Sequence, residues 1–324
     1  MVITVSIRPE VIDFIPHYPN NHLVHGDHIW TSNGPYGGNI NDITSDGNHI
    51  YIGLLMNGVY RLEANMWQAR RTGIEYRTVN TIISAGTDII FAGLNQGGLW
   101  QTTNAGQDWH LNSTIPESIS ITTIFRYDNN NLFAGTENAG LLRSTDGGVN
   151  WNSIGNIDTV YATTFARDTL NLYLGTLGGG IYQSIDLGTT WLSISSPSPW
   201  IWKLDWISPG LLSKYLYCGS EQGLFFRKDS LTPEWHGTIL QTPISDFVFS
   251  GDSIIVGTWN EGIWIGAIGD SIFHNRSSGL VYKSINTIEI IGDTILVGTT
   301  GGFFYSSNHG LTWQERNQNL NASA

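Results

Sequence analysis

Four histidines near the beginning of the chain are dense enough to suggest a metal site. The segment HYPNNHLVHGDH contains His17, His22, His25 and His28, with Asp27 beside the last of them. Imidazole and carboxylate groups gathered in this way could bind zinc or nickel. Nothing in the segment predicts a helix, so a spacing of three residues does not place the rings on one face. We therefore favour a solvated segment, and the sequence predicts no cofactor.

Carboxylates provide a second chemistry, the hydrolysis of glycosides. Such enzymes use two carboxyl groups about 5 to 9.5 Å apart. Asp205 and Asp246 lie in the apolar stretches IWKLDW and ISDFVF, and Glu261 lies in TWNEG. Burial beside a cavity would tune such groups for acid and base roles. Asp42 and Glu289 show, however, that acids are scattered along the repeats without evident pairing. A glycoside hydrolase is therefore the alternative and not the favoured function.

A third set of residues suits binding without catalysis. Amide and carboxylate groups form hydrogen bonds with hydroxyl groups, while aromatic side chains cover the apolar faces of sugar rings. The candidates are Asn41, Asn80, Tyr161, Trp200, Trp202, Trp259, Asn260 and Glu261. The favoured function is that of a non-catalytic scaffold that recognises a protein or a glycan.

A repeat along the chain must position these residues. Its marker is a glycine that closes an apolar run, at Gly53, Gly93, Gly135, Gly175, Gly219, Gly257 and Gly298, with intervals of 40, 42, 40, 44, 38 and 41 residues. A unit of this length holds four short strands and cannot bury its own apolar faces, so the copies must pack against one another. Seven copies predict an all-β fold, a seven-bladed antiparallel β-propeller with four-stranded blades.

The four strands of each blade can be placed from the same pattern. The first strand is expected to start at Ile40, Val79, Ile121, Val160, Ile201, Ile244 and Ile285, and the second to end at the marker glycine. A second glycine precedes the third strand and suits a hairpin that needs positive φ, at Gly58, Gly98, Gly140, Gly180, Gly223, Gly262 and Gly302. The fourth strand carries Trp67, Trp109, Trp151, Trp191, Trp235 or Trp313, with Phe273 in blade six. We expect these rings to wedge between neighbouring sheets.

Closure of the ring would gather the starts of the first strands around one mouth of a central channel. Closed β structures usually hold ligands at such a mouth. The second residue of each first strand is polar or amphipathic in every blade: Asn41, Asn80, Thr122, Tyr161, Trp202, Ser245 and Asn286. Loops between second and third strands border the same mouth, and one of them contains Trp259, Asn260 and Glu261. The binding candidates are thus expected to share one face.

Residues 1–38 do not follow the repeat, whereas residues 39–324 form the predicted propeller. The segment DHIWTSNG places Trp30 where a fourth strand would carry its tryptophan. This N-terminal extension is therefore expected either to pair with the edge of the seventh blade, which would close the ring, or to form an arm. The start, MVITVSIRPE, has no basic region and is not a secretory signal as written.

Four turns share one motif. They are STDGGVNW at 144–151, SIDLGTTW at 184–191, and TTNAGQDW and SSNHGLTW, in which Asn104 and Asn308 replace the aspartate. They resemble the Asp-box, or bacterial neuraminidase repeat, with the pattern Ser/Thr-x-Asp-x-Gly-x-Thr-Trp. The box occurs in sialidases, xyloglucanases, sortilin-type receptors and the luminal assembly factor of photosystem II. The resemblance therefore implies a propeller and no particular activity. It also implies an extracytoplasmic protein, whether secreted, on the cell surface or periplasmic.

Composition narrows the range of partners. Charged residues make up 13% of the chain and the net charge is −12, whereas nucleic-acid binding depends on clustered Lys and Arg. No apolar run approaches the roughly 20 residues that cross a bilayer. The single cysteine, Cys218, is expected to be a buried strand residue. The expected partner is a protein or glycan, without nucleic acid or membrane insertion. A structural subunit of an extracellular assembly is a further alternative.

Overall fold

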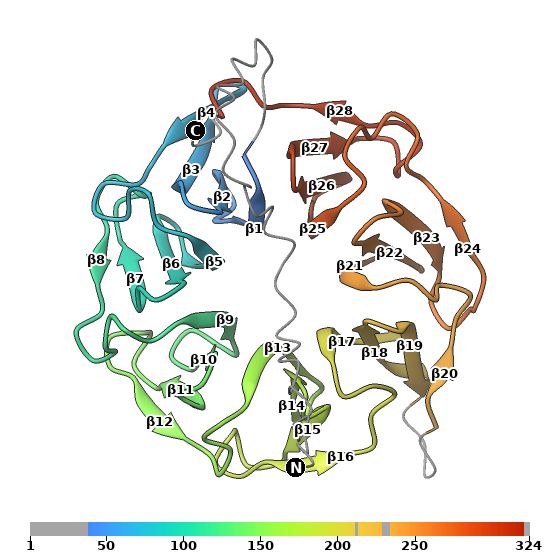
Figure 1. Cartoon of the computed structure of the whole chain (residues 1–324), viewed down its shortest axis with the longest axis horizontal. Helices are drawn as coiled ribbons and strands as arrows, with labels where there is room; N and C mark the ends of the chain where they lie inside the picture. Colours follow the sequence, from blue (N-terminus) through green and yellow to red (C-terminus); the bar gives the residue numbers. More distant parts are fainter. Residues whose placement is uncertain (1–37, 211–212, 229–233, 321–324) are drawn as a thin grey trace, which may run out of the picture. The chain divides into compact units, whose positions relative to one another are not determined.

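The structure of the chain, a computed structural model, describes residues 38–210, 213–228 and 234–320. Two units can be separated, Met1–Gly34 and Pro35–Ala324, and every described residue belongs to the second. That unit contains seven antiparallel sheets of four strands, and no residue in the described ranges is helical. The predicted all-β, seven-bladed propeller is confirmed (Figure 1).

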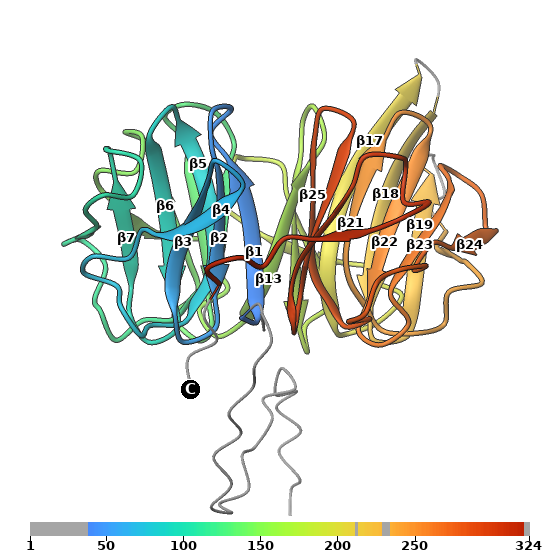
Figure 2. The same ribbon diagram turned by 90° about the horizontal axis from the view of Figure 1, so that it is seen from above.

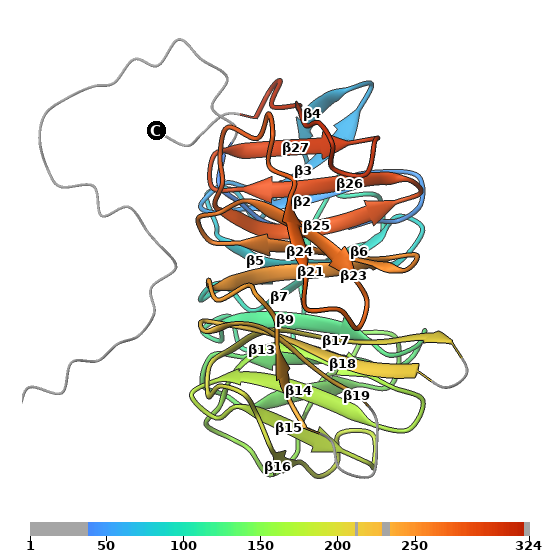
Figure 3. The same ribbon diagram turned by 90° about the vertical axis from the view of Figure 1, so that its right-hand side faces the viewer.

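Each blade is built from four consecutive strands. They are β1 (Ile40–Ser45), β2 (Ile50–Leu54), β3 (Gly58–Glu63) and β4 (Met66–Ala69); β5 (Val79–Gly86), β6 (Ile89–Leu94), β7 (Leu99–Thr102) and β8 (His110–Leu111); β9 (Ile121–Arg126), β10 (Leu132–Thr136), β11 (Leu141–Ser144) and β12 (Asn152–Ile154); β13 (Tyr161–Arg167), β14 (Leu172–Leu177), β15 (Ile181–Ser184) and β16 (Leu192–Ile194); β17 (Ile201–Gly210), β18 (Ser213–Ser220), β19 (Gly223–Lys228) and β20 (His236–Gly237); β21 (Ile244–Ser250), β22 (Ser253–Thr258), β23 (Ile263–Ala267) and β24 (Phe273–Asn275); β25 (Ile285–Ile291), β26 (Thr294–Thr299), β27 (Gly302–Ser306) and β28 (Gln314–Glu315). The first strands surround the axis of the ring and the fourth strands lie at the rim, while neighbouring sheets face each other (Figures 1, 2 and 3).

The first strands begin at the predicted residue in six blades, and blade four is the exception. There β13 begins at Tyr161, one residue after the predicted Val160. The pairing explains the difference, because Ala162 pairs with Thr176 as Ile40 pairs with Leu54. The small Ala162, which is fully buried, thus takes the place that larger apolar residues occupy in the other blades.

The marker glycines are required by close packing between blades. A Cβ atom on Gly175 would lie 2.7 Å from Cγ2 of Ile201, in the first strand of the next blade. Because contacts this short are not tolerated, the first strand of each blade fits against a glycine of the preceding one. The second strands continue one or two residues past these glycines, so the predicted strand ends were slightly early. The second set of glycines has positive φ in all seven blades, as predicted, from +68° at Gly98 to +140° at Gly302.

The aromatic residue predicted for the fourth strand wedges between sheets, as expected, in six blades. Trp67 and Phe273 lie within that strand, whereas in the other five blades the tryptophan directly precedes it. Trp67 is almost fully buried and contacts Phe303 of blade seven edge to face, with ring centroids 5.0 Å apart. The other buried members are Trp109, Trp151, Trp191, Phe273 and Trp313. Trp235 of blade five is partly exposed. Its blade therefore deviates from the repeat at the rim.

The ring closes between blades one and seven. In the described ranges, each of these blades consists of its own four consecutive strands, and neither sheet is completed by a strand from the other end of the chain. Blade seven takes all four strands from residues 285–315. A Cβ atom on Gly298 would lie 2.6 Å from Cγ2 of Ile40, so this junction repeats the packing of the others. Trp67 adds two hydrogen bonds, from N to the Gln318 carbonyl at 3.1 Å and from Nε1 to the Arg316 carbonyl at 2.7 Å. The predicted pairing of DHIWTSNG lies outside the described residues.

The turn at 144–151 is held by its own side chains, as expected. Ser144 Oγ donates to Asp146 Oδ1 at 2.8 Å and accepts from the amide of Gly148 at 2.8 Å. Asp146 also accepts from the backbone and side chain of Asn150, which lowers the pKa of Asp146 to about 2. The turn at 184–191 repeats this arrangement.

Cys218 is buried and free. Over the described residues, no helix is long and apolar enough to cross a membrane.

Candidate functional site

A β-bulge lies near the beginning of every first strand. In β1, Ile40 pairs with Leu54 and Asp42 with Gly53, so Asn41 is an extra residue in the ladder. The same shift makes extra residues of Asn80, Thr122, Thr163, Trp202, Ser245 and Asn286 in the other blades. A bulge re-aims the side chain of its extra residue. Seven redirected side chains therefore lie at one end of the channel.

Five of these side chains connect neighbouring blades. Each donates a hydrogen bond to a backbone carbonyl of the next first strand: Asn41 to Val79 at 2.9 Å, Asn80 to Ile121 at 2.9 Å, Thr122 to Ala162 at 2.6 Å, Thr163 to Ile201 at 2.6 Å, and Asn286 to Ile40 at 2.8 Å. The candidates Asn41 and Asn80 thus help to hold the ring together. Their contact with a ligand stays a prediction.

Tyr161 does not occupy the bulge that the sequence analysis gave it. The register shift falls between Ala162 and Thr164, so Thr163 is the extra residue in blade four. Tyr161 instead pairs with Leu177 at the beginning of β13. The error arose because Val160 was taken as the buried residue that packs against the preceding blade. Ala162 has this role, because a Cβ atom on Gly135 of that blade would lie 2.5 Å from the Cβ of Ala162. A binding role for Tyr161 remains untested.

Blades five and six interrupt the circle of hydrogen bonds. Their bulge residues are Trp202 and Ser245, and neither Trp202 Nε1 nor Ser245 Oγ has a hydrogen-bond partner among the described residues, although both atoms are buried. Trp202 contacts Trp259 of blade six edge to face, with ring centroids 4.8 Å apart. Leaving a buried polar atom unpaired costs about 1 to 3 kcal/mol. This part of the ring therefore carries a cost that the other five bulges avoid.

The loop after β22 connects the contact between Trp202 and Trp259 with the protein surface. Trp259 is partly buried, whereas Asn260 and Glu261 are exposed. Asn260 Oδ1 accepts a hydrogen bond from Thr242 Oγ1 at 3.2 Å, which orients its amide. We call Trp202, Ser245, Trp259 and Asn260 the mouth patch. The structure thus brings together three predicted binding residues, Trp202, Trp259 and Asn260, with Ser245, which was not among the predicted binding residues.

The remaining predicted residues lie at different distances from the mouth patch along the ring. Trp200 is partly buried, forms an isolated bridge with Leu177 of blade four, and donates its backbone N–H to Ser198 Oγ at 2.9 Å. Asn41 and Asn80 belong to blades one and two, which blade seven separates from blade six on that side of the ring. His17, His22, His25 and His28 lie outside the described residues.

The channel behind the mouth patch contains an ion pair between blades five and six. Lys203 Nζ lies 2.8 Å from Asp246 Oδ1. Asp246 also accepts from the backbone amides of Phe247 at 2.8 Å and of Ile288, in blade seven, at 2.7 Å. Asp42 repeats this role in blade one, with bonds from the amides of Ile43 and of Ile82 in blade two. The two aspartates therefore bridge blades.

The acids of the channel are close enough to influence one another, which corrects the expectation that they are scattered. Burial raises the pKa of Asp42 to about 6 and that of Glu289 to about 7, and it raises the pKa of Asp205 as well. Burial alone would lower the pKa of Lys203, but Asp246 and Asp205 outweigh it and raise that pKa above its ordinary value. One lysine thus stabilises a group of four carboxyl groups. The sequence analysis overlooked Lys203, although it is the lone lysine within a first strand.

The raised pKa of Glu289 predicts a pH-dependent stability. The native state binds this proton more tightly than the unfolded chain, so the contribution of Glu289 is fully present below about pH 4.5 and is lost as the pH rises through about 7. Glu289→Gln should therefore match the natural protein near pH 4.5 and exceed it by about 1 to 2 kcal/mol at pH 8. This stability difference is smaller than the full pKa shift of Glu289 implies, because the Glu289 side chain is partly exposed and water screens its charge. Urea unfolding across this pH range measures the difference.

The matched control for this prediction is Glu137→Gln, on the loop between β10 and β11. Glu137 is not among the charges that shift the pKa values of Asp42, Asp205 and Glu289, so its replacement should leave the pH dependence that Glu289 causes unchanged. Equal pH dependence in Glu289→Gln and the natural protein would contradict the assignment of Glu289 to a desolvated site in the channel.

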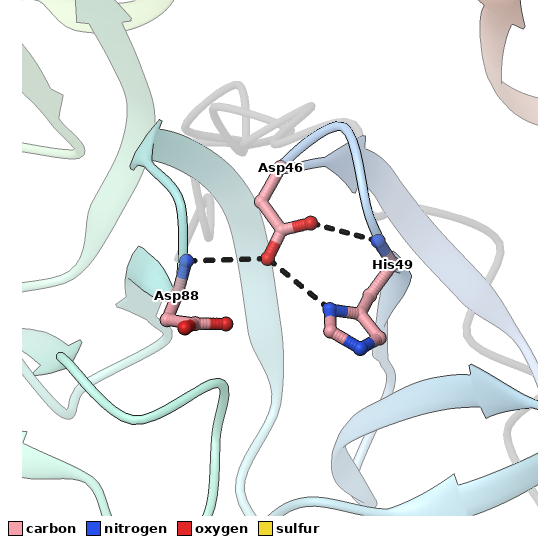
Figure 4. A group of neighbouring side chains, drawn as sticks. All are labelled: Asp46, His49 and Asp88. Carbon is pink, nitrogen blue, oxygen red and sulfur yellow. Dashed lines mark hydrogen bonds and ion pairs between the residues drawn. The ribbon is translucent and has the colours of Figure 1, made fainter.

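A cluster of possible metal ligands elsewhere has a structural explanation. One ligand atom each from Asp46, His49 and Asp88 lies within 4.8 Å of the others, and Figure 4 shows the Asp46 carboxylate between them. That carboxylate accepts from the amides of Asn48 and His49 at 2.9 and 2.7 Å, from Tyr51 at 3.1 Å and from the amide of Asp88 at 3.3 Å. Its oxygens are thus engaged in fixing the loop after β1.

Comparisons with known proteins identify the fold. No protein-family model and no curated protein sequence matches the chain. Among solved structures, an ancestral GH74 enzyme superimposes with a TM-score of 0.68 at 16% identity, over 90% of this chain and 48% of that one. YCF48 bound to D1 peptide gives a TM-score of 0.66 at 13% identity, over 84% of this chain and 93% of that one. The extracellular domain of a hybrid two-component system from B. thetaiotaomicron gives 0.64 at 16%, over 84% and 40%.

These similarities concern architecture. The neighbours include both enzymes and a protein bound to a peptide, and this chain spans about half the length of the GH74 enzyme. At such identities a shared propeller does not transfer an activity. The chemistry of the mouth patch and the channel must therefore carry the functional argument.

Proposed function

We propose that the protein is a non-catalytic binding scaffold that recognises a protein or a glycan through the mouth patch. The observation that carries this proposal is the interruption of the bulge circle at blades five and six. Five bulges form hydrogen bonds between blades, whereas Trp202 and Ser245 keep buried polar atoms without partners among the described residues. These two side chains therefore do not connect neighbouring blades as the other five do, and their partly exposed surfaces are left for a ligand.

The arrangement of the mouth patch suits recognition. Trp202 and Trp259 are held edge to face, so they combine a large apolar area with low conformational freedom. Asn260 supplies an exposed amide beside them. Rigid aromatic anchors with a few oriented polar groups are the usual composition of protein and carbohydrate sites. An extracytoplasmic location agrees with the extracellular-domain neighbour and with the likeness of the turns to the Asp-box.

Catalysis by the predicted carboxylates is less well supported. A glycoside hydrolase needs one carboxyl group free to donate a proton and another free to attack or activate water. Asp246 is occupied by two backbone amides and Lys203, and Glu261 lies on the exposed loop after β22. Asp205 Oδ1 accepts from the amide of Trp206 at 2.7 Å. Asp205 and Asp246 are near enough for the charge of Asp246 to raise the pKa of Asp205, but Asp246 is paired with Lys203 and is therefore not free to attack or to activate water.

Replacement of Trp202 tests the proposal. The natural protein is applied to arrays of oligosaccharides and of peptides, and the affinity for the best binder is then measured by calorimetry. Trp202→Ala should weaken that affinity by about 1 to 3 kcal/mol, the range of an aromatic hot spot. Its melting temperature should stay close to that of the natural protein, because the side chain is partly exposed.

Trp235→Ala is the matched control, because Trp235 is a partly exposed tryptophan of the same blade at the rim. It should bind as the natural protein does. If Trp202→Ala instead costs about 3 to 5 kcal/mol of folding free energy, as the truncation of a core tryptophan does, Trp202 is a core residue. Unchanged affinity in Trp202→Ala would equally refute the proposal.

A further inference from the structure

The two tryptophans of the mouth patch form two walls of a corner. Trp202 comes from the bulge of β17 and Trp259 from the loop after β22, with ring centroids 4.8 Å apart and an angle of 62° between the ring planes. Both residues are partly exposed. The face of an indole ring is electron-rich and attracts a cation within about 6 Å of its centre. Two indoles inclined in this way suit the binding of one cation between them.

A carboxylate without a cation partner lies beside this corner in blade five. Glu221 belongs to the loop between β18 and β19, directly after the residue that pairs with Ile201, and Ile201 precedes Trp202. Glu221 accepts hydrogen bonds from Ser198 Oγ at 2.7 Å and from Gln222 Nε2 at 3.4 Å. Both donors are neutral, and Glu221 forms no ion pair with any described residue. Its charge is therefore left to act on a ligand.

The channel behind the corner adds further negative charge. Lys203 directly follows Trp202 in the chain, and its ammonium group lies 2.8 Å from Asp246. This one cation faces four carboxyl groups, those of Asp42, Asp205, Asp246 and Glu289. One ammonium group neutralises one carboxylate, so the channel is negative whenever a second acid is ionised. Charges that line a concave opening attract ligands of the opposite sign.

The loops that border the mouth show the same preference. The seven loops between second and third strands, at 55–57, 95–98, 137–140, 178–180, 221–222, 259–262 and 300–301, all belong to the described ranges. They contain Glu137, Glu221 and Glu261, and neither lysine nor arginine. Cations near blade six lie on the connection to blade seven, where Arg276 and Lys283 are exposed. The charged side chains of the seven loops are thus all negative.

We propose that the mouth patch recognises a lysine or arginine side chain on a protein partner. This inference rests on the proposed function and specifies the partner. The charged end of the partner's side chain would lie against the rings of Trp202 and Trp259, in the negative potential of Glu221 and of the channel acids. A protein with a basic surface gains from that potential, whereas a neutral glycan does not.

Three pentapeptides that differ only in their central residue test the proposal. Each has two glycines on either side of arginine, lysine or citrulline, and both ends are blocked. Citrulline has nearly the shape of arginine but no charge. Titration of the full chain is followed through the indole N–H resonances of its tryptophans. The arginine and lysine peptides should bind at least about tenfold more tightly than the citrulline peptide, and added salt should weaken their binding.

Glu221→Gln tests the carboxylate beside the corner. The new side chain still offers an oxygen to Ser198 Oγ, so the loop should keep its structure while it loses the charge. The affinity for the arginine peptide should fall about threefold to tenfold, and that for the citrulline peptide should stay unchanged. Glu137→Gln is the matched control, because Glu137 lies in the corresponding loop of blade three. It should bind both peptides as the natural protein does.

A change of pH tests the contribution of the channel. Burial raises the pKa of Asp42 to about 6 and that of Glu289 to about 7, so both acids lose their negative charges as the pH falls from 8 to 5. The affinity for the arginine peptide should therefore fall over this range, and that for the citrulline peptide should not. The fall should be smaller in Glu289→Gln, because one of the two acids no longer titrates there.

Three results would overturn the inference. One is the absence of binding for the arginine and lysine peptides at millimolar concentration, and another is equal affinity for the arginine and citrulline peptides. The third is an equal loss of affinity in Glu221→Gln and Glu137→Gln, which would assign the effect to net charge. The proposed function survives each of them if the best binder from the arrays still requires Trp202. If instead Trp202→Ala binds the arginine peptide as the natural protein does, both proposals are wrong.

Discussion

Replacement of Lys203 by methionine should lower the free energy of unfolding at pH 8 by about 2 to 4 kcal/mol. Lys203 is the cation that faces Asp246, Asp205 and Glu289 in the channel. Removing one partner of a buried ion pair leaves an uncompensated charge, which costs about 3 to 5 kcal/mol when burial is complete. The lower range applies here because the Lys203 side chain keeps 30% of its surface exposed.

The pH dependence of this variant distinguishes electrostatics from packing. Lys203 lowers the pKa values of Asp205 and Glu289, so without it those acids become protonated at higher pH. The penalty of Lys203→Met should therefore shrink as the pH falls from 8 to 5, as measured by urea unfolding. The double variant Lys203→Met, Asp246→Asn should recover much of the loss at pH 8, because the second change removes the unpaired charge. A penalty that stays constant with pH, or a double variant less stable than the single one, would contradict this account.

Gly298→Ala should be the most damaging conservative change at the junction between blades one and seven, with a loss of about 3 kcal/mol. The added Cβ would lie 2.6 Å from Cγ2 of Ile40 and 2.7 Å from Cγ2 of Thr287. Both neighbours are buried on first strands, so neither can move away without a shift of the backbone. Overpacking of this kind costs about 1 to 3 kcal/mol, and more where the surroundings are rigid. Thermal and chemical unfolding measure the loss.

Gly237→Ala provides the matched control, because its Cβ would meet Phe225 at an ordinary 3.4 Å. That variant should change stability by less than about 0.5 kcal/mol. A double-mutant cycle with Ile40→Ala adds a second check, since the cost of Gly298→Ala should be smaller once Cγ2 of Ile40 is absent. If the two glycine variants are equally stable, the junction is more loosely packed than the structure indicates.

The fold could be predicted from sequence because its requirements are local and repeated. Each blade needs a glycine where the next first strand approaches and another where a hairpin needs positive φ, and both recur at nearly constant spacing. The predicted start of a first strand was less accurate in blade four, where a small residue packs against the marker glycine of the preceding blade. In blade four, Ala162 fits against Gly135, and the larger Val160 was taken in its place.

The candidate site was predicted only in part, because its decisive contacts join residues of different blades. Trp202 and Trp259 were expected at one mouth and are in contact there. The polar residues Asn41 and Asn80 have the composition of a ligand surface, yet their amides donate to carbonyls of the next blade, which no local pattern reveals. Likewise, Asp42 and Glu289 influence each other only because the ring closes between blades one and seven.

The junction between blades one and seven has a mechanical consequence. Within the described residues no strand crosses from one blade to the other, and the contact consists of packed side chains such as Ile40 against Gly298, with hydrogen bonds from Trp67 and Asn286. A force that pulls residues 38 and 320 apart would therefore meet no β-ladder loaded in shear at this junction. The two blades would separate as packed faces, one contact after another, while every sheet stayed intact.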